Sequence, residues 1–438
     1  MTAPLLSWGR YPRYLQRART CAWRGEIADV LRRMVVTAGH TLPFGNGRSY
    51  GDSCLAVSDR VLPMRAMNRF IQADWQAGVV IVEAGMTLAE LLRVAIPRGW
   101  FLAVTPGTQF ATLGGALAND VHGKNHHKKG TFGCHVRRFG LIRSDRPPLT
   151  CSAEENSELF AATIGGLGLT GVVDWIELEL VAIGSSAVDV LETRFDNLDD
   201  FFALSAELDP VHEYAVAWID CLARGAATGR GVYMAGDHAP EGGLRQRERT
   251  PVDVVITPPV SAINRFSLRW FNSAYYRRHR PGRQRRRIEY DAFFYPLDRV
   301  LNWNRIYGPR GFQQYQCAIP DASAAPAITE LLGAIATANS GSFLAVLKRF
   351  GDRPSPGLLS FPLPGTTLAL DFPQQGEATA SLFAHLDAIV RAAGGRLYPA
   401  KDAHMSGADF RAWYPAWEQV QALRDPLLAS RFWQRVTT

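Results

Sequence analysis

The chain has 438 residues, 47% hydrophobic and 20% charged, so it can bury a large core and is expected to form more than one compact unit. The 39 glycines and 26 prolines are near ordinary usage, and no apolar run reaches the ~18 residues of a membrane span, which excludes collagen-like, low-complexity and membrane-spanning classes. The net charge of +7 makes an anionic partner worth considering. No secretory signal is visible, so a cytoplasmic location is expected.

Between residues 27 and 180, short β-branched runs alternate with glycine clusters and helical patterns, which is typical of α+β or α/β structure. Strands are predicted over 78–84 and near 169–173. A helix is predicted from Thr87, where Glu90 three residues later would complete a capping box.

From about residue 183 to 393 the glycine clusters thin out, and strands are predicted over 214–219, 311–319, 343–347 and 367–372. These strands indicate a second domain built around an antiparallel sheet. The stretch 245–287 mixes proline, arginine and aromatic residues without a period, so a long mobile loop is expected there. The chain after residue 394 is aromatic and helical and is expected to pack back onto the first domain.

The cysteines and clustered histidines do not form a recognisable metal site. The six cysteines lie far apart without a C-x-x-C pair, as expected for reduced thiols. His122, His126 and His127 lack the acid of an H-E-x-x-H motif and a cysteine at zinc spacing. We therefore expect no metal.

Three glycine-rich segments carry the chemistry that the sequence suggests. The first, 42–52 (LPFGNGRSYGD), has the backbone amides of a phosphate-binding nest but matches neither a Walker loop nor G-x-G-x-x-G before a helix. Taken alone, it is equally consistent with a simple turn. The second, 105–127, combines small residues with Thr, Asn and His, as a wall against a large flat ligand would. The third, 165–173 (GGLGLTGVV), leads into a strand.

In this order, the three segments resemble the FAD-binding domain of the vanillyl-alcohol-oxidase or PCMH-type flavoproteins. Further motifs along most of the chain, including HGKNHH, YPLD, QYQ, LKRFG, DFP and LYPAKD, resemble the decaprenylphosphoryl-β-D-ribose 2′-oxidase family, the flavin subunits of a ribose-to-arabinose epimerase. The resemblance implies an α+β fold in which a PCMH-type FAD-binding domain carries an inserted substrate (cap) domain, built on an antiparallel sheet with flanking helices.

The resemblance also implies which residues bind FAD. The first loop would wrap the pyrophosphate, the second segment would line the flavin, and Val173 would contact the adenine side. Many relatives attach the flavin covalently through a histidine of the first loop, but Arg48 takes that position here, so non-covalent FAD is expected. The implied cofactor-binding residues are Pro43, Phe44, Gly45, Asn46, Gly47, Arg48, Ser49, Tyr50, Gly51, Asp52, Ser53, Gly107, Thr112, Leu113, Gly114, Gly115, Asn119, Asp120, Val121, His122, Val173 and Tyr398.

The implied chemistry is hydride transfer from a sugar carbon to flavin N5 while a base takes the hydroxyl proton. Lys401 and His122 are the candidate catalytic residues. A histidine needs little pKa adjustment for this role, whereas a lysine must be buried or paired with charge. Lys401 is equally consistent with electrostatic stabilisation of reduced flavin, and His122 with orienting the ring.

The implied substrate pocket includes polar residues at alternate positions of one strand, which face the same side of a sheet. A solvated sheet face for Gln314 and Gln316, or an ordinary surface charge for Lys348, are the plainer interpretations. Relatives commonly have a cysteine and an asparagine where this chain has Ala369 and Thr367, which makes the substrate less certain. The implied pocket residues are Tyr50, Gln314, Gln316, Lys348, Thr367, Ala369 and Lys401.

The expected organisation is an FAD-binding domain over 1–183, a cap domain over 184–395 with the basic loop near 245–287, and a returning segment over 396–438. The expected substrate is a polyprenyl-phosphate-linked pentose whose 2′-keto product passes to a separate short-chain reductase. An oxygen-using oxidase of free sugars, alditols or aldonolactones is the alternative.

The arginines between 275 and 287 suggest peripheral contact with the inner face of the plasma membrane or a solvated loop. A nucleic-acid partner is not expected, because no paired nucleic-acid motif is present.

Overall fold

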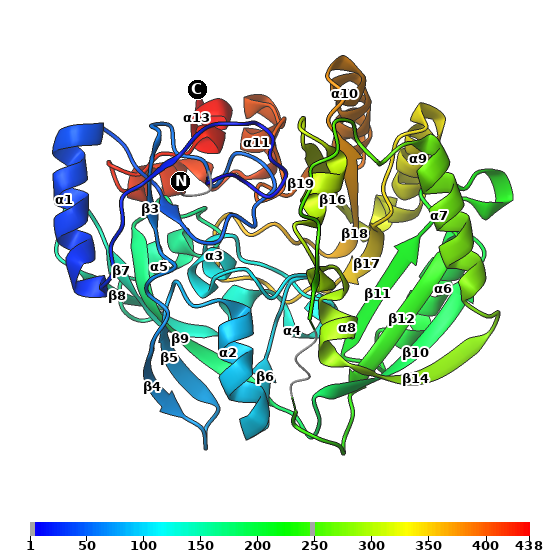
Figure 1. Cartoon of the computed structure of the whole chain (residues 1–438), viewed down its shortest axis with the longest axis horizontal. Coiled ribbons are helices and arrows are strands. Elements are labelled where there is room, and N and C mark those ends of the chain that lie inside the picture. The colour runs from blue at the N-terminus through cyan, green and yellow to red at the C-terminus, as the bar shows by residue number, and fades with distance from the viewer. Residues whose placement is uncertain (1–4, 246–249) are drawn as a thin grey trace.

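The computed structural model describes residues 5–245 and 250–438, which form two sheet-based halves set side by side (Figure 1). The first half is built on an antiparallel sheet of order β4-β5-β9-β7-β8, with β6 paired to β9. Its strands are β4 (Phe70–Asp74), β5 (Val79–Glu83), β6 (Trp100–Leu102), β7 (Val136–Ile142), β8 (Leu149–Ser152) and β9 (Val172–Ala182).

Short helices cover this sheet and connect its strands. The predicted capping box is confirmed at α2 (Leu88–Ala95): Thr87 Oγ1 accepts a hydrogen bond from the Glu90 amide at 3.2 Å, and the Glu90 carboxylate accepts one from the Thr87 amide at 2.7 Å. The other elements of this half are β1 (Arg17–Ala18), α1 (Ile27–Ala38), β2 (Pro43–Phe44), β3 (Arg60–Pro63), α3 (Leu113–Ala118), α4 (His126–Lys129) and α5 (Ser157–Thr163).

The second half is built on a larger sheet of order β14-β10-β12-β11-β17-β18-β16-β19. Every neighbouring pair in it is antiparallel, which confirms the expected sheet type. The strands predicted over 214–219, 311–319 and 367–372 are β11, β16 and β18 within two residues. The strand predicted over 343–347 is β17, which starts two residues later and ends three residues later than predicted. The strands are β10 (Ala187–Phe195), β11 (Tyr214–Ile219), β12 (Gly231–His238), β14 (Arg283–Glu289), β16 (Phe312–Pro320), β17 (Ala345–Phe350), β18 (Gly365–Pro373) and β19 (Arg396–Leu397).

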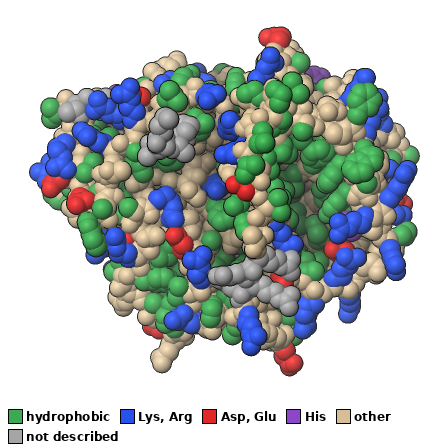
Figure 2. Space-filling view, viewed as in Figure 1, with side chains coloured by type: hydrophobic (Ala, Val, Ile, Leu, Met, Phe, Trp, Pro, Cys, Tyr) green, Lys and Arg blue, Asp and Glu red, His purple; other side chains and the backbone are tan. Residues whose placement is uncertain are grey.

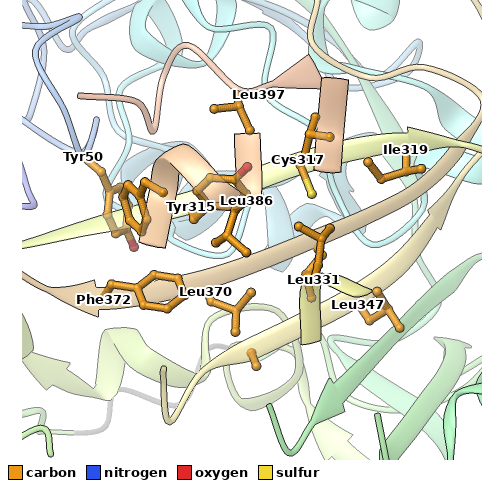
Figure 3. Close-up of a cluster of buried hydrophobic side chains, with 14 of the residues drawn as sticks. Tyr50, Tyr315, Cys317, Ile319, Leu331, Leu347, Leu370, Phe372, Leu386 and Leu397 are labelled. Carbon is orange, nitrogen blue, oxygen red and sulfur yellow. The ribbon is translucent and has the colours of Figure 1, made fainter. Parts of the chain in front are cut away.

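The two faces of this sheet differ in chemistry because side chains alternate along each strand. On the far face, Tyr315 and Cys317 of β16 pack with Leu370 of β18 against Leu331 and Leu386, as Figure 3 shows. The last two residues belong to α9 (Asp321–Ala338) and α10 (Glu377–Ala392). A slip of the strand pairing by one residue would move Gln314 and Gln316 into this apolar layer. The apolar core therefore fixes the register of β16 and, with it, the residues of the polar face.

The stretch 245–287, expected to be a long mobile loop, is mostly ordered secondary structure; residues 246–249 lie outside the described residues. It contains α7 (Arg265–Arg278) and β14, with a short pair of β13 (Val252–Asp253) and β15 (Val300–Leu301) beside them. Asn264 caps α7, and Tyr276 packs on Trp218 and Val232 of the sheet. The expectation was wrong because Tyr276 belongs to the buried face of α7, and because Arg286 and Arg287 of β14 pair with acids on β10.

The C-terminal segment returns to the first half. Its helices are α11 (Gly407–Trp413), α12 (Trp417–Leu423) and α13 (Arg431–Thr437), which lie near the N-terminal strands in Figure 1. The backbone amides of Thr41 and Arg431 donate hydrogen bonds to the carbonyls of Leu427 and Leu55 at 2.9 and 2.8 Å. Remaining helices are α6 (Leu198–Leu208) and α8 (Tyr290–Phe294). Across residues 5–245 and 250–438, no helix is long and apolar enough to cross a membrane.

Candidate active site

The glycine-rich loop 43–53 is held between the start of α3 and the C-terminal segment. A side chain at Gly45 would collide with the Thr112 hydroxyl, and one at Gly51 would overlap the carbonyl oxygen of Asp402. Both positions therefore admit only glycine. This close approach explains the glycine spacing that the sequence shows, and it brings two segments more than 350 residues apart into one wall.

The turn after α3 forms a second wall of the site. Asp120 is fully buried with a positive φ of 39°, and its carboxylate accepts hydrogen bonds from the Gly133 amide at 2.8 Å and from the Ser355 and Ser360 hydroxyls at 2.5 Å each. Three donors satisfy this carboxylate within the protein. Asp120 therefore fixes the path of the backbone over 119–122, and its carboxylate is not left free for a ligand.

The loop also leaves polar atoms without a protein partner. Arg48 Nε and Ser53 Oγ are buried and have no hydrogen-bond partner among the described residues. The Arg48 guanidinium lies 4.1 Å from the ring centroid of Trp8 and 5.1 Å from that of Phe110, so its plane is fixed by stacking. A Cβ at Gly107 would meet no atom within 4 Å. Buried unpaired donors beside an open glycine fit an anionic, flat cofactor such as FAD.

The YPLD motif at residues 295–298 contacts the loop 105–109 of the first half. Asp298 accepts hydrogen bonds from the Thr108 hydroxyl at 2.8 Å and from the Gln109 amide at 2.7 Å, while the Tyr295 and Thr105 hydroxyls lie 2.6 Å apart. Burial raises the pKa of Asp298 to about 6. This contact between the two halves positions the 105–109 backbone.

His122 stands between two side chains of the large sheet. Its Nδ1 lies 2.8 Å from Lys348 Nζ and its Nε2 lies 3.0 Å from Gln316 Nε2, and Lys348 also donates to the Gly123 carbonyl at 2.6 Å. Desolvation, and then the charge of Lys348, hold the pKa of His122 well below its usual value. Burial lowers the pKa of Lys348 to about 7. A neutral imidazole with both ring nitrogens engaged orients its neighbours and has no nitrogen free for a substrate proton.

Lys401, in the turn that follows β19, forms a second cluster with Tyr50 and Asp371. Its Nζ lies 3.8 Å from the ring centroid of Tyr50, and desolvation lowers its pKa to about 7, although the nearby Asp371 carboxylate opposes that shift. Asp371 is 1% exposed; its Oδ1 accepts a hydrogen bond from Gln314 Nε2 at 2.7 Å, and its Oδ2 is buried with no partner among the described residues. Burial raises the pKa of Asp371 to about 7. Near neutral pH, each group of this pair is close to its titration midpoint.

Asp371 is the functional candidate that the sequence analysis missed. Thr367, Ala369 and Asp371 occupy alternate positions of β18, so their side chains share one face with Gln316 of β16, whose Cα pairs with that of Ala369. The first two were expected in the pocket, and continuing the period of two by one step reaches Asp371. The alternation along β18 was therefore the sequence signal that could have identified Asp371.

The sheet face brings most of the expected pocket residues together. Gln314, Gln316 and Lys348 are each at most 8% exposed, which overturns the plainer interpretations of a solvated face and a surface charge. Tyr398 joins this cluster to the cofactor wall, because its hydroxyl donates to the Asn119 carbonyl at 2.8 Å and its ring centroid lies 5.6 Å from that of His122.

Two expected cofactor residues have other roles as well. The Asp52 carboxylate pairs with Arg435 at 2.8 Å, and Arg435 also contacts Asp402 at 2.8 Å, so this ion-pair cluster ties the first loop to the C-terminus. Val173 lies on β9 with its Cα opposite that of Leu141 and packs in the core of the first half.

The clustered histidines have different hydrogen-bond partners in the fold. His126 Nδ1 accepts a hydrogen bond from the Gly351 amide at 3.2 Å, and His127 Nε2 lies 3.1 Å from the His212 carbonyl. No group of three or more potential metal ligands occurs among residues 5–245 and 250–438.

Comparisons with known proteins agree with this geometry. Residues 18–146 match the model of an FAD binding domain family. The chain is 31% identical over 441 residues to the decaprenylphosphoryl-β-D-ribose oxidase of Mycolicibacterium smegmatis, covering 97% of this chain and 95% of that protein. It is 33% identical over 352 residues to an uncharacterized protein in the mprA 5′ region of Streptomyces coelicolor, covering 77% and 95%. L-gulonolactone oxidase of Mus musculus is 29% identical over 180 residues, 40% of each chain.

Proposed function

The chain belongs to the decaprenylphosphoryl-β-D-ribose oxidase family of FAD-dependent oxidoreductases, and we propose from this premise that it oxidises the 2′-hydroxyl of a polyprenylphosphoryl-linked pentose. The 2′-keto product would pass to a separate short-chain reductase. The observation that carries the proposal is the row of buried polar side chains on the large sheet, Gln314, Gln316 and Lys348, together with Lys401 in the turn after β19. Such a row can hold several sugar hydroxyls in one orientation.

Bound FAD supplies the acceptor for the hydride that leaves the sugar carbon. The chain's own residues must then take the hydroxyl proton. Lys401 is the proposed acceptor, because its pKa of about 7 makes the neutral amine available near neutral pH. The proton converts Lys401 to an ammonium, which the Asp371 carboxylate beside it stabilises, and the pair later returns the proton to water. Because both nitrogens of His122 contact protein side chains, we assign it a positioning role.

Positive charge is available for the phosphate of the substrate. Lys348 and Lys124 lie close enough that the charge of Lys124 contributes to lowering the pKa of Lys348, and burial lowers the pKa of Lys124 to about 8. A phosphate would return protons to both amines and would compensate their desolvation.

FAD is proposed to bind without a covalent bond. Arg48 occupies the loop position at which many relatives carry the linking histidine, and an arginine does not form that bond. After denaturation and filtration, the yellow colour should appear in the filtrate. Flavin absorbance that stays with the unfolded polypeptide would contradict this part of the proposal.

The test of the function is an anaerobic absorbance trace of the purified flavoprotein mixed with a short-chain polyprenylphosphoryl ribose analogue and, separately, with a free alditol. Bleaching of oxidised flavin by the lipid-linked sugar alone is the expected result. Bleaching by the alditol alone would favour the alternative, an oxidase of free sugars, alditols or aldonolactones that uses oxygen. The likeness of 40% of the chain to L-gulonolactone oxidase is the observation behind that alternative.

A lipid-linked substrate places the enzyme at a membrane surface, and we propose a peripheral location at the inner face of the plasma membrane. The reductase that consumes the 2′-keto sugar would act there as well. The mixed apolar and basic surface of the cap domain supports this location.

A further inference from the structure

Exposed apolar side chains are concentrated in one short stretch of the cap domain. Of the twelve large hydrophobic residues exposed in the described part of the chain, six fall between residues 252 and 270. Trp270 is 75% exposed and Phe266 69%, one turn apart on α7. The segment before α7 adds Val252, Val255, Ile256 and Val260, each at least 68% exposed. Apolar groups gathered in this way mark a surface that contacts something other than water.

Basic residues surround these apolar side chains. Residues 250–280 contain five arginines, Arg265, Arg269, Arg277, Arg278 and Arg280, and a single acidic residue, Asp253. Within the described residues, none of the five forms an ion pair with a carboxylate. Figure 2 shows hydrophobic and basic side chains mixed over the part of this face where α7 lies.

The arginines of β14 differ from those of α7. Arg283 pairs with Glu207, Arg286 with Glu192, and Arg287 with Asp189, at 2.5 to 3.3 Å. The charge of these three arginines is compensated by carboxylates of α6 and β10. The uncompensated positive charge therefore lies on and around α7, beside the exposed aromatic residues.

This surface lies on the same side of the large sheet as the candidate active site. Trp218 pairs with Val346, so it shares a face with Lys348 two residues farther along β17, and Tyr275 of α7 packs on Trp218 at 4.5 Å between ring centroids. The segment before α7 contacts the N-terminal segment, because Thr257 accepts a hydrogen bond from Arg10 at 3.4 Å. The N-terminal segment in turn contacts the glycine-rich loop, because the Trp8 amide donates to the Ser49 carbonyl at 2.7 Å. An occupant of the surface would therefore lie on the side of the sheet that carries the candidate active site.

We propose that residues 252–270 form an apolar docking surface, named here the α7 surface, that inserts into the headgroup region of an anionic phospholipid membrane while the neighbouring arginines contact lipid phosphates. Trp270 suits this interface because its apolar ring carries a polar N–H, and Phe266 adds apolar area. Each arginine near an anionic leaflet strengthens binding about fivefold. The inference rests on the proposed lipid-linked substrate, whose headgroup would then reach the site without leaving the membrane.

The test measures vesicle binding of the full flavoprotein without any substrate. Vesicles of equal parts phosphatidylglycerol and phosphatidylcholine should bind the wild type, and pure phosphatidylcholine vesicles should bind it much more weakly. The double variant Phe266→Ala, Trp270→Ala should lower the partition coefficient by at least about tenfold, because two large apolar side chains no longer enter the lipid. Trp23→Ala is the matched control, since Trp23 is 57% exposed outside this surface; its partition coefficient should equal that of the wild type.

A second measurement does not depend on the double variant folding. Brominated phosphatidylcholine in the anionic vesicles should quench part of the wild-type tryptophan fluorescence, and Trp270→Phe should remove that quenching. Quenching that Trp270→Phe leaves unchanged, or a double variant that binds vesicles like the wild type, would overturn the proposal. So would a wild-type dimer that the double variant converts to a monomer, because a second copy would then cover the surface.

A separate measurement distinguishes failure of the proposed function from failure of the docking surface. The double variant should still reduce its flavin with the water-soluble short-chain analogue at the wild-type rate. A wild type that binds anionic vesicles through Trp270 but is not reduced by that analogue would refute the proposed substrate and leave the docking surface intact.

Discussion

Replacing Asp371 by asparagine tests the proton-accepting pair most directly. In the wild type, the rate of flavin reduction should rise with pH through about 7, because Lys401 acts as the neutral amine and its pKa is about 7. The Asp371 carboxylate raises that pKa, so its removal lowers it. Removing a nearby opposite charge shifts a pKa by about 1–3 units, equivalent to about 1.4–4 kcal/mol, so the midpoint should move clearly below pH 7. The plateau rate should also fall, because a weaker base accepts the proton less readily.

The assay is anaerobic stopped-flow reduction of the bound flavin as a function of pH. Asparagine keeps the shape of the side chain and an oxygen that accepts from Gln314. Asp174→Asn is the control, since Asp174 is also a buried carboxylate whose pKa burial raises to about 6, but it lies on β9 and its charge partners are Arg24 and Glu83. A midpoint that stays near 7 in Asp371→Asn, or moves upward, would refute the coupling between Asp371 and Lys401.

Three further predictions concern other parts of the site. Lys401→Ala should keep the flavin absorbance and slow its reduction by about 10²- to 10⁴-fold in single-turnover traces; normal reduction would remove Lys401 from the mechanism. Arg435→Ala should lower the free energy of unfolding by about 3–5 kcal/mol in denaturant titrations, because it leaves the buried Asp52 carboxylate without its ion-pair partner and leaves Asp402 with His404 alone. Arg17→Ala removes an ion pair with Asp59 in which the arginine side chain is 79% exposed, so it should cost only about 0–1 kcal/mol; equal losses would contradict this. Inhibitors that react with the pocket cysteine of relatives should not label the wild type in mass spectra but should label Ala369→Cys; labelling of the wild type would show that the two positions do not correspond.

Local patterns in the sequence were enough for elements whose energetics are local. The capping box at Thr87 and Glu90 needs only two side chains three residues apart, and the alternation of β16 and β18 shows in the sequence because each strand has one apolar and one polar face. The stretch 245–287 could not be understood in this way. Tyr276 is buried because it packs on Trp218, which lies far away in the sequence. The arginines of β14 look like a solvated run in the sequence, because their partners Glu192 and Asp189 lie on β10.

The sequence by itself determined the flavoprotein family and the glycine positions. Close approach of two backbone segments requires glycine, and the glycine spacing is visible in the sequence. Only the tertiary structure decided the roles of the titratable groups. Whether His122 can take a proton depends on Lys348 and Gln316 reaching both of its nitrogens, and whether Lys401 is neutral depends on its desolvation and on Asp371. A pKa is set by burial and by charges from distant parts of the chain, and no spacing in the sequence records those distances.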